Sequence, residues 1–207
     1  KPSLSVGPDG LCAFFFYNLK YVLCKPLSII FEVSYRTGEL PSAWKQAIVV
    51  PIFKKGLSHC IGNYRPISLC CVSCKLMESI INSALTNYLD SRKILKNQQY
   101  GFRKQKSCTL QLLNSMNKWT KHIDSKIPID VVYIDFQKAF DSVVHSKLLI
   151  KLQSYGINGF LLKWITSFLS NRVQSVKVES VISDPAPVIS GVPQGSVLGP
   201  TIYIHLE

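Results

Sequence analysis

The sequence predicts an α+β fold, because segments with helical spacing of apolar residues alternate with short β-type runs, without repeats or low-complexity linkers. Its 207 residues are 47% apolar, which is enough to bury one substantial core. A further observation is the loop at residues 190–200, which places three glycines and two prolines around one amide side chain, Gln194. Such a loop allows the backbone to approach a ligand closely.

The individual elements follow from apolar periodicity and from turn residues. Asp9 is placed to cap the first helix, Pro26 to interrupt it and Gly38 to end it. Gly156 ends a later helix, and Asp141, next to Ser142, precedes that helix as its expected N-cap. The expected helices are at residues 11–38, 75–89, 109–123, 143–155 and 160–169, and the expected strands at 46–53, 129–135 and 172–181.

The net charge of +12 is concentrated in one part of the chain. Residues 45–106 hold eleven basic residues and only two acidic ones, Glu78 and Asp90. Such clustering is typical of a surface that binds phosphate groups. The alternative is a solvated basic face or a charge-balanced surface for a partner, and salt-sensitive binding to RNA distinguishes these from a phosphate-binding surface.

Neither a membrane segment nor a secretion signal is evident. No apolar run approaches the ~20 residues that cross a bilayer, so we expect a soluble intracellular protein. The odd number of cysteines, seven, favours free thiols in a reducing compartment. Cys71 and Cys74 form a C-x-x-C pair with His59-Cys60 upstream, but their apolar neighbours favour burial over a zinc site.

Six motifs in chain order carry a family resemblance. They are Gly7-Pro8-Asp9-Gly10; Leu40-Pro41 with Trp44-Lys45 and Pro51-Ile52-Phe53-Lys54-Lys55-Gly56; Asn63-Tyr64-Arg65-Pro66-Ile67-Ser68-Leu69; Gln99-Tyr100-Gly101-Phe102-Arg103-Lys104; Tyr133-Ile134-Asp135-Phe136-Gln137-Lys138-Ala139-Phe140-Asp141; and the 190–200 loop. Each motif alone is a weak signal. In this order, they resemble the reverse transcriptases of non-LTR, LINE-like retrotransposons, which include the jockey-type elements.

The resemblance implies a right-hand polymerase fold. An N-terminal helical extension would occupy residues 1–44, the fingers 45–125 and a partial palm 126–207. Because the chain begins without methionine and stops within an apolar run, we expect a fragment of a longer polyprotein. The resemblance implies that this polyprotein carries an endonuclease domain upstream. The family's next motif, an aromatic-Ala-Asp-Asp hairpin, is expected beyond Glu207, and no two acidic residues are adjacent in this sequence.

The resemblance also implies a metal site. Polymerisation uses two Mg²⁺ ions, which join the primer hydroxyl to the nucleotide phosphate and prefer oxygen ligands. By resemblance, Asp135 is the catalytic metal ligand and the backbone carbonyl of Phe136 a second contact. The alternative from the residues alone is that Asp135 caps the turn after its strand.

Nucleotide and template contacts are implied in the same way. The residues matched to the incoming nucleotide are Lys54, Lys55, Arg65, Phe136, Phe140, Gln194 and Gly195, and those matched to nucleic acid are Arg103, Lys104 and Lys106. Arginine suits phosphate because its planar fork donates two hydrogen bonds. Phe140 would exclude a 2′ hydroxyl, and the alternative is an ordinary core phenylalanine. For the Lys54-Lys55 pair the alternative is a surface lysine turn, and for the Gln194 loop it is a plain Gly/Pro surface loop. Gln105-Lys106 and Cys108 depart from the family pattern, which leaves the template contacts there open.

The function implied is an RNA-directed DNA polymerase of a retrotransposon. Its partners would be an RNA template, a DNA primer and deoxynucleoside triphosphates, in the nucleus and cytoplasm. One alternative is an inactive remnant that binds RNA or DNA through its basic fingers. Another is a decayed product that folds poorly, because a truncated palm leaves an unpaired sheet edge.

Overall fold

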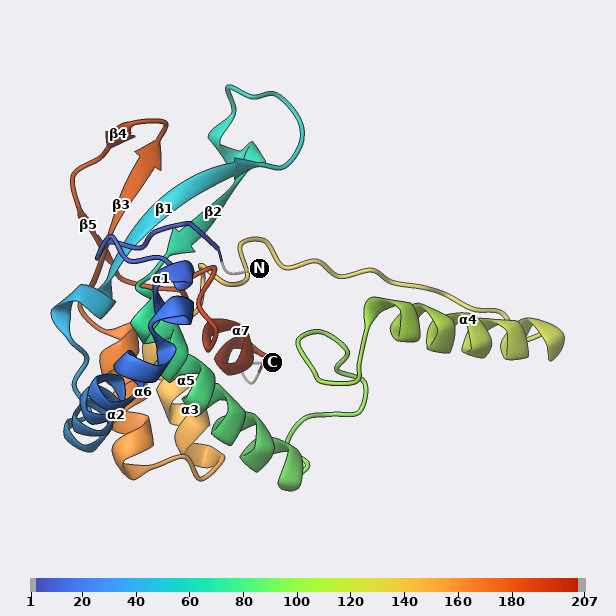
Figure 1. The fold of residues 1–207 in the computed structure, drawn as a ribbon. Coiled ribbons are helices and arrows are strands. Elements are labelled where there is room, and N and C mark those ends of the chain that lie inside the picture. Colours follow the sequence, from blue (N-terminus) through green and yellow to red (C-terminus); the bar gives the residue numbers. More distant parts are fainter. Residues whose placement is uncertain (1–2, 205–207) are drawn as a thin grey trace.

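The computed structural model describes residues 3–204 and has the mixed α+β architecture expected (Figure 1). A small sheet lies on one side of a group of helices, and α4 projects away from both. The α-helices are α1 Ala13–Asn18, α2 Lys20–Thr37, α3 Val72–Ser91, α4 Cys108–Asp124, α5 His145–Ser154, α6 Gly159–Leu169 and α7 Gly199–Tyr203. The strands are β1 Gln46–Phe53, β2 Tyr64–Leu69, β3 Arg172–Val178, β4 Val181–Ile182 and β5 Ala186–Val188, and the 3₁₀ turns are η1 Ser42–Lys45 and η2 Ile61–Asn63.

The sheet is mixed, with β1 between β2 and β3. β1 pairs antiparallel with β2 and parallel with the start of β3, while β4 and β5 both pair antiparallel with β3. Pro51 of β1 lies opposite Pro66 of β2. Two residues without N–H donors are tolerated there because β2 is an edge strand and the pairing of β1 with β3 ends at Val49.

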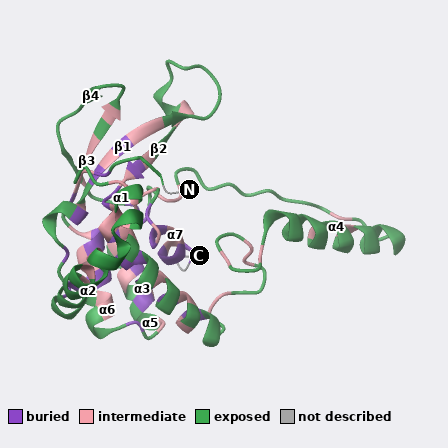
Figure 2. Ribbon diagram, viewed as in Figure 1, coloured by how far each residue is buried: buried purple, intermediate pink, exposed green. Residues whose placement is uncertain are grey.

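The core lies between the helices, where the buried residues gather (Figure 2). Leu85 of α3, Leu148 of α5 and Trp164 of α6 are almost completely buried. Trp164 stacks on Phe168 with 5.6 Å between ring centroids, and its indole N–H donates to Ser34 of α2. Each such side chain contributes about 1.5–3 kcal/mol through burial, so these contacts hold α2, α3, α5 and α6 together.

The N-terminal helix differs from its prediction. It breaks at Leu19, between α1 and α2, and Pro26 lies inside α2. Proline there removes the helical donor to the Val22 carbonyl, but Val22 is exposed, so water can satisfy that oxygen. Asp9 is not the cap: its carboxylate accepts the Leu11 N–H, and the N-cap of α1 is Cys12. Gly38 ends α2 as expected, with φ of 69°.

The strand expected at residues 129–135 is absent from the structure. This segment is extended but pairs with no strand among residues 3–204, and Val132, Tyr133 and Ile134 are exposed. A β-rich sequence favours extended backbone, yet a strand also needs a neighbour for its N–H and C=O groups. The expected helix at 109–123 does form, as α4, but none of its residues is buried.

The other expected elements form with small shifts of their ends. β1 has the predicted bounds, α3 begins three residues earlier than predicted, and the strand predicted at 172–181 divides into β3 and the start of β4. α5 begins at His145 with Val144 as N-cap, so the prediction that Asp141 caps this helix was wrong. None of the helices within residues 3–204 is long and apolar enough to cross a membrane.

Three cysteines lie in the core where β2 leads into α3. Cys70, Cys71 and Cys74 are buried, and the Cys71 thiol donates to the Ala43 carbonyl at 3.2 Å. Burial raises the pKa of Cys71 to about 12 and also raises the pKa of Cys70 and Cys74. Because the thiolate is the reactive form, these thiols are poor metal ligands and poor nucleophiles at neutral pH.

We therefore predict two classes of cysteine in alkylation with iodoacetamide. Cys24, Cys60 and Cys108 are exposed and should react under native conditions, whereas Cys70, Cys71 and Cys74 should react only after unfolding. Peptide mass spectrometry after a timed reaction, with and without denaturant, measures this. Native labelling of the three buried thiols at the rate of the exposed ones would contradict this core.

Candidate functional site

The first half of the 190–200 loop is fastened to the segment between residues 140 and 145. The Gly191 N–H donates to the Val143 carbonyl and the Val192 N–H to the Phe140 carbonyl, both at 2.9 Å. The His145 ring nitrogen Nε2 lies 2.7 Å from the Gly191 carbonyl oxygen. These contacts join the loop to the turn that precedes α5.

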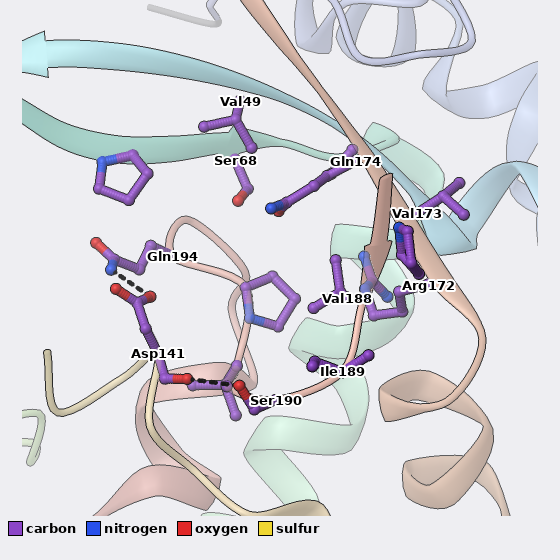
Figure 3. Close-up of a pocket in the computed structure, with 16 residues that line it drawn as sticks. Val49, Ser68, Asp141, Arg172, Val173, Gln174, Val188, Ile189, Ser190 and Gln194 are labelled. Atoms are coloured by element: carbon purple, nitrogen blue, oxygen red, sulfur yellow. Dashed lines mark hydrogen bonds between the residues drawn. The ribbon is translucent and has the colours of Figure 1, made fainter. Parts of the chain in front are cut away.

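Gln194 is held at both its backbone and its side chain. Its carbonyl oxygen accepts the Ser68 N–H of β2 at 2.7 Å, and its side-chain Nε2 donates to Asp141 Oδ1 at 2.8 Å (Figure 3). Ser190 Oγ also donates to the Asp141 carbonyl oxygen at 3.0 Å. The Asp141 carboxylate therefore orients the Gln194 amide, instead of capping a helix.

The loop glycines are required by contacts with the protein itself. At Gly195, φ is 111° and a Cβ would lie 2.8 Å from the Ser68 carbonyl oxygen. At Gly191, φ is 84° and a Cβ would lie 2.8 Å from the Asp141 Cα. Side chains are disfavoured at such positive φ values. Gly195 and Gly191 therefore allow close packing against β2 and the 140–145 segment, and the predicted contact of Gly195 with a nucleotide stays a prediction.

The second half of the loop is fastened to α3 by Glu78. Glu78 Oε2 accepts the Val197 N–H at 2.7 Å and the Leu198 N–H at 3.0 Å, and Cys74 Sγ lies 3.5 Å from Oε1. Burial raises the pKa of Glu78, and the two backbone amides act in the opposite direction. The carboxylate thus supplies the acceptor that these buried amides need.

A cavity of about 330 Å³ lies between this loop and the sheet. Figure 3 shows Ser68 and Gln174 on the sheet side and Asp141, Gln194 and Ser190 on the loop side. Its lining therefore offers amide, hydroxyl and carboxylate groups beside apolar surface. A planar polar group that both donates and accepts hydrogen bonds suits such a lining.

Asp135 and Phe136 lie outside this cavity, in the unpaired segment. Both are exposed, and Phe136 lines a separate cavity of about 760 Å³ with Lys147 and Tyr203. Within residues 3–204, no group of three or more His, Cys, Asp or Glu side chains could hold a metal ion. Asp135 with the Phe136 carbonyl is an incomplete ligand set for two Mg²⁺ ions, each of which prefers six oxygen ligands.

Phe140 is half-buried and packs on other aromatic rings. Its centroid lies 4.4 Å from that of Tyr203 and 5.9 Å from that of Phe102. Its backbone carbonyl accepts the Val192 N–H at 2.9 Å, so the main chain of Phe140 also contacts the first half of the loop. The ring thus has a packing role whatever else it contacts.

The basic residues predicted to bind phosphate fall into two structural classes. Lys54 and Lys55, at the turn after β1, and Arg65, on the edge strand β2, are exposed. Arg103 forms an ion pair with Asp90 at 3.0 Å and also donates to the Lys96 carbonyl. Lys106 donates to the Asn97 carbonyl and lies 4.6 Å from the Tyr100 ring centroid, whereas Lys104 is exposed. Arg103 and Lys106 therefore already stabilise the loop that carries them.

The sequence did not reveal the roles of three residues at the site. Glu78 anchors the second half of the loop, Asp141 orients Gln194, and the buried Arg172 donates to the Phe168 carbonyl at 3.0 Å. The sequence pattern could have indicated Glu78, because this charged residue falls one turn after Cys74 on the face of α3 that is otherwise apolar. No local pattern marks Asp141 as the partner of a residue more than fifty positions away.

Comparisons with known proteins identify the family of this chain. Residues 52–206 match the family described as reverse transcriptase (RNA-dependent DNA polymerase). The chain is 34% identical over 210 residues to the probable RNA-directed DNA polymerase from transposon BS of Drosophila melanogaster, covering 96% of this chain and 22% of that protein. It is 36% identical over 178 residues to the RNA-directed DNA polymerase from mobile element jockey of the same species, covering 86% of this chain and 19% of that protein. The chain thus spans about a fifth of the length of these curated relatives.

We predict that Gly195→Ala lowers the free energy of unfolding by about 1–3 kcal/mol through backbone strain, with more from the clash with Ser68. Gly10→Ala is a control for strain alone, because Gly10 has φ of 70° and open space around it. Gly62→Ala, at an ordinary φ in open space, should change stability by less than about 0.5 kcal/mol. Urea denaturation compares the three, and equal effects at Gly195 and Gly62 would contradict the close contact with β2.

Proposed function

We propose that this chain, which belongs to the reverse transcriptase (RNA-dependent DNA polymerase) family, is part of an RNA-directed DNA polymerase of a non-LTR retrotransposon. The enzyme would add deoxynucleotides to the 3′ hydroxyl of a DNA primer on an RNA template. The observation that carries the proposal is the fastening of the Gln194 loop to β2 and to the 140–145 segment, around one polar cavity. This arrangement brings together three of the motifs on which the family resemblance depends.

In this proposal the right-hand polymerase fold is divided as the sequence suggests. Residues 45–125 would form the fingers, 126–207 part of the palm and 1–44 an N-terminal helical extension. The pairing of β1 with β2 around the exposed Lys54-Lys55 turn supports a fingers role, since the turn carries positive charge away from the core. The contacts of Gln194 with both Ser68 and Asp141 would then join fingers to palm.

The incoming nucleotide would lie against the Gln194 loop. Gln194 and Gly195 offer an amide side chain and exposed backbone, while Arg65, Lys54 and Lys55 would bind the triphosphate. Phe140 would lie beneath the sugar and exclude a 2′ hydroxyl. Its packing on Tyr203 and Phe102 supports this role, because a ring fixed by neighbours makes an effective steric barrier.

Mg²⁺, when bound, would activate the primer hydroxyl and neutralise charge on the transferred phosphate. Asp135 and the Phe136 carbonyl are this chain's proposed oxygen ligands. Because they are too few for two ions, further carboxylates would have to come from outside residues 3–204. Arg103, Lys104 and Lys106 would contribute to template binding through the charge of their loop.

A second function, nucleic-acid binding without catalysis, is favoured by one observation. No group of three or more His, Cys, Asp or Glu side chains that could hold a metal ion occurs among the described residues, while the Lys54-Lys55 turn is exposed. This function needs only positive charge that contacts phosphates. The two functions predict different results in primer extension and the same result in RNA binding.

We expect Asp135→Asn to reduce primer extension on an RNA template by at least about 100-fold at low salt with Mg²⁺, since it removes a charged group that acts on the transition state. Asp130→Asn is the matched control, because it removes an exposed carboxylate from the same extended segment. Extension is measured by gel electrophoresis of a labelled primer. Equal extension by all three proteins would reject the role of Asp135, and no extension with RNA binding retained would favour the second function.

Replacing both Lys54 and Lys55 with alanine should make RNA binding less sensitive to salt. If each lysine neutralises one phosphate, the slope of log K against log salt concentration falls by about 1.4–1.8. The control variant replaces Lys20 and Lys25 of α2, which removes the same charge from another surface. Fluorescence anisotropy at several salt concentrations measures the slopes, and identical slopes for the two variants would reject a specific role for the turn.

A further inference from the structure

Glu78 is the one buried carboxylate among residues 3–204. Its side chain is completely buried within α3, on the face that carries Cys74, Met77 and Ile81. An ionised group in such surroundings is costly unless hydrogen bonds compensate for lost water. Its partners therefore indicate why this position holds a glutamate.

Those partners are backbone amides of the Gln194 loop. One carboxylate oxygen accepts both the Val197 N–H, at 2.7 Å, and the Leu198 N–H, at 3.0 Å. Arg172, the only buried cation among the described residues, donates instead to the Phe168 carbonyl and lies 3.9 Å from Cys70 Sγ. Two successive amides that face one anion resemble the backbone nests that bind phosphates, with a protein carboxylate as the anion.

The contact fixes the loop immediately after Gln194. Upstream, the Gln194 carbonyl is held by Ser68, and downstream, three residues later, the Val197 amide is held by Glu78. Gly195 lies between these two anchors with φ of 111°. Because glycine has wide conformational freedom, the position of the Gln194 side chain depends on both anchors.

We propose that Glu78 is a positioning residue that holds the Gln194 loop in its nucleotide-binding conformation. It acts through the Val197 and Leu198 amides, without contacting the nucleotide. Without this acceptor, the two N–H groups lose their partner in a buried environment, and the loop rearranges to hydrate them. The Gln194 amide then leaves Asp141, and the deoxynucleotide loses a preformed contact. The link to nucleotide affinity rests on the proposed function; the link to loop conformation does not.

The test compares Glu78→Gln, Glu78→Met and the unchanged chain by NMR. Glutamine keeps the shape and one carbonyl acceptor, whereas methionine keeps only the length. In Glu78→Met we expect hydrogen exchange of the Val197 and Leu198 amides at least about tenfold faster than in the unchanged chain, and a shift of the Gln194 side-chain amide signal. In Glu78→Gln, the exchange rates and the Gln194 signal should be closer to those of the unchanged chain. The dissociation constant of a deoxynucleoside triphosphate, with primer and RNA template present, should rise about tenfold or more in Glu78→Met.

Leu85→Ala is the matched control for general loss of stability. Leu85 is buried on the same helix but lies two turns beyond Glu78, towards the C-terminal end of α3. Leu85→Ala should lower the urea midpoint while leaving the Gln194 signal and the nucleotide affinity of the folded protein unchanged. If Leu85→Ala moves these readouts as much as Glu78→Met does, or if Glu78→Met leaves them unchanged, the proposal is overturned.

The two proposals fail in different ways. Lack of nucleotide binding by the unchanged chain would overturn the proposed function, and the exchange rates of Val197 and Leu198 would then decide alone whether Glu78 positions the loop. Nucleotide binding by the unchanged chain that Glu78→Met retains in full would overturn the positioning role and leave the proposed function intact.

Discussion

At Gly195 the backbone of the 190–200 loop passes so close to the Ser68 carbonyl that no Cβ fits between them. The adjacent Gln194 carbonyl accepts the Ser68 N–H, so the loop is attached to the outer strand of the sheet by its main chain. The remaining contacts of the site depend on this approach. The Gln194 side chain reaches Asp141 while its backbone is held against β2, and the cavity lies where loop and sheet meet. A chain without glycine at this position would have to move the loop or the strand.

The same loop explains why a glutamate, Glu78, lies in the core. Glu78 lies among apolar side chains where leucine would pack without loss of hydration, and burial raises its pKa. Hydrogen bonds offset this cost, because the carboxylate accepts two backbone N–H groups that no apolar side chain could satisfy. Arg172, at the start of β3, is another buried charged group with compensating contacts. Its guanidinium donates to the Phe168 carbonyl and lies over the Phe168 ring.

The segment from α4 to residue 136 shows local preference without tertiary support. Ser107 caps α4 by accepting the Leu110 N–H, and the helix forms along its full predicted length, yet none of its residues is buried. The next extended residues have the composition of a strand but no neighbouring strand among those described. Helical hydrogen bonds lie within one segment, so periodicity and a cap suffice to form a helix. A strand depends on a partner, and its composition alone does not form one.

Sequence alone determined the α+β class, the positions of most helices, the bounds of β1 and the family resemblance. These depend on apolar periodicity, helix-ending glycines such as Gly38 and motif order, all of which are local properties of the chain. It also identified the Gln194 loop, but not the packing of Gly191 and Gly195 against the protein itself. Tertiary structure alone decided that Asp141 binds Gln194, that Glu78 binds the Val197 and Leu198 amides, and that residues 129–135 remain unpaired. Each of these outcomes depends on which distant segment supplies a donor, an acceptor or a neighbouring strand, and local sequence preference carries no information about that.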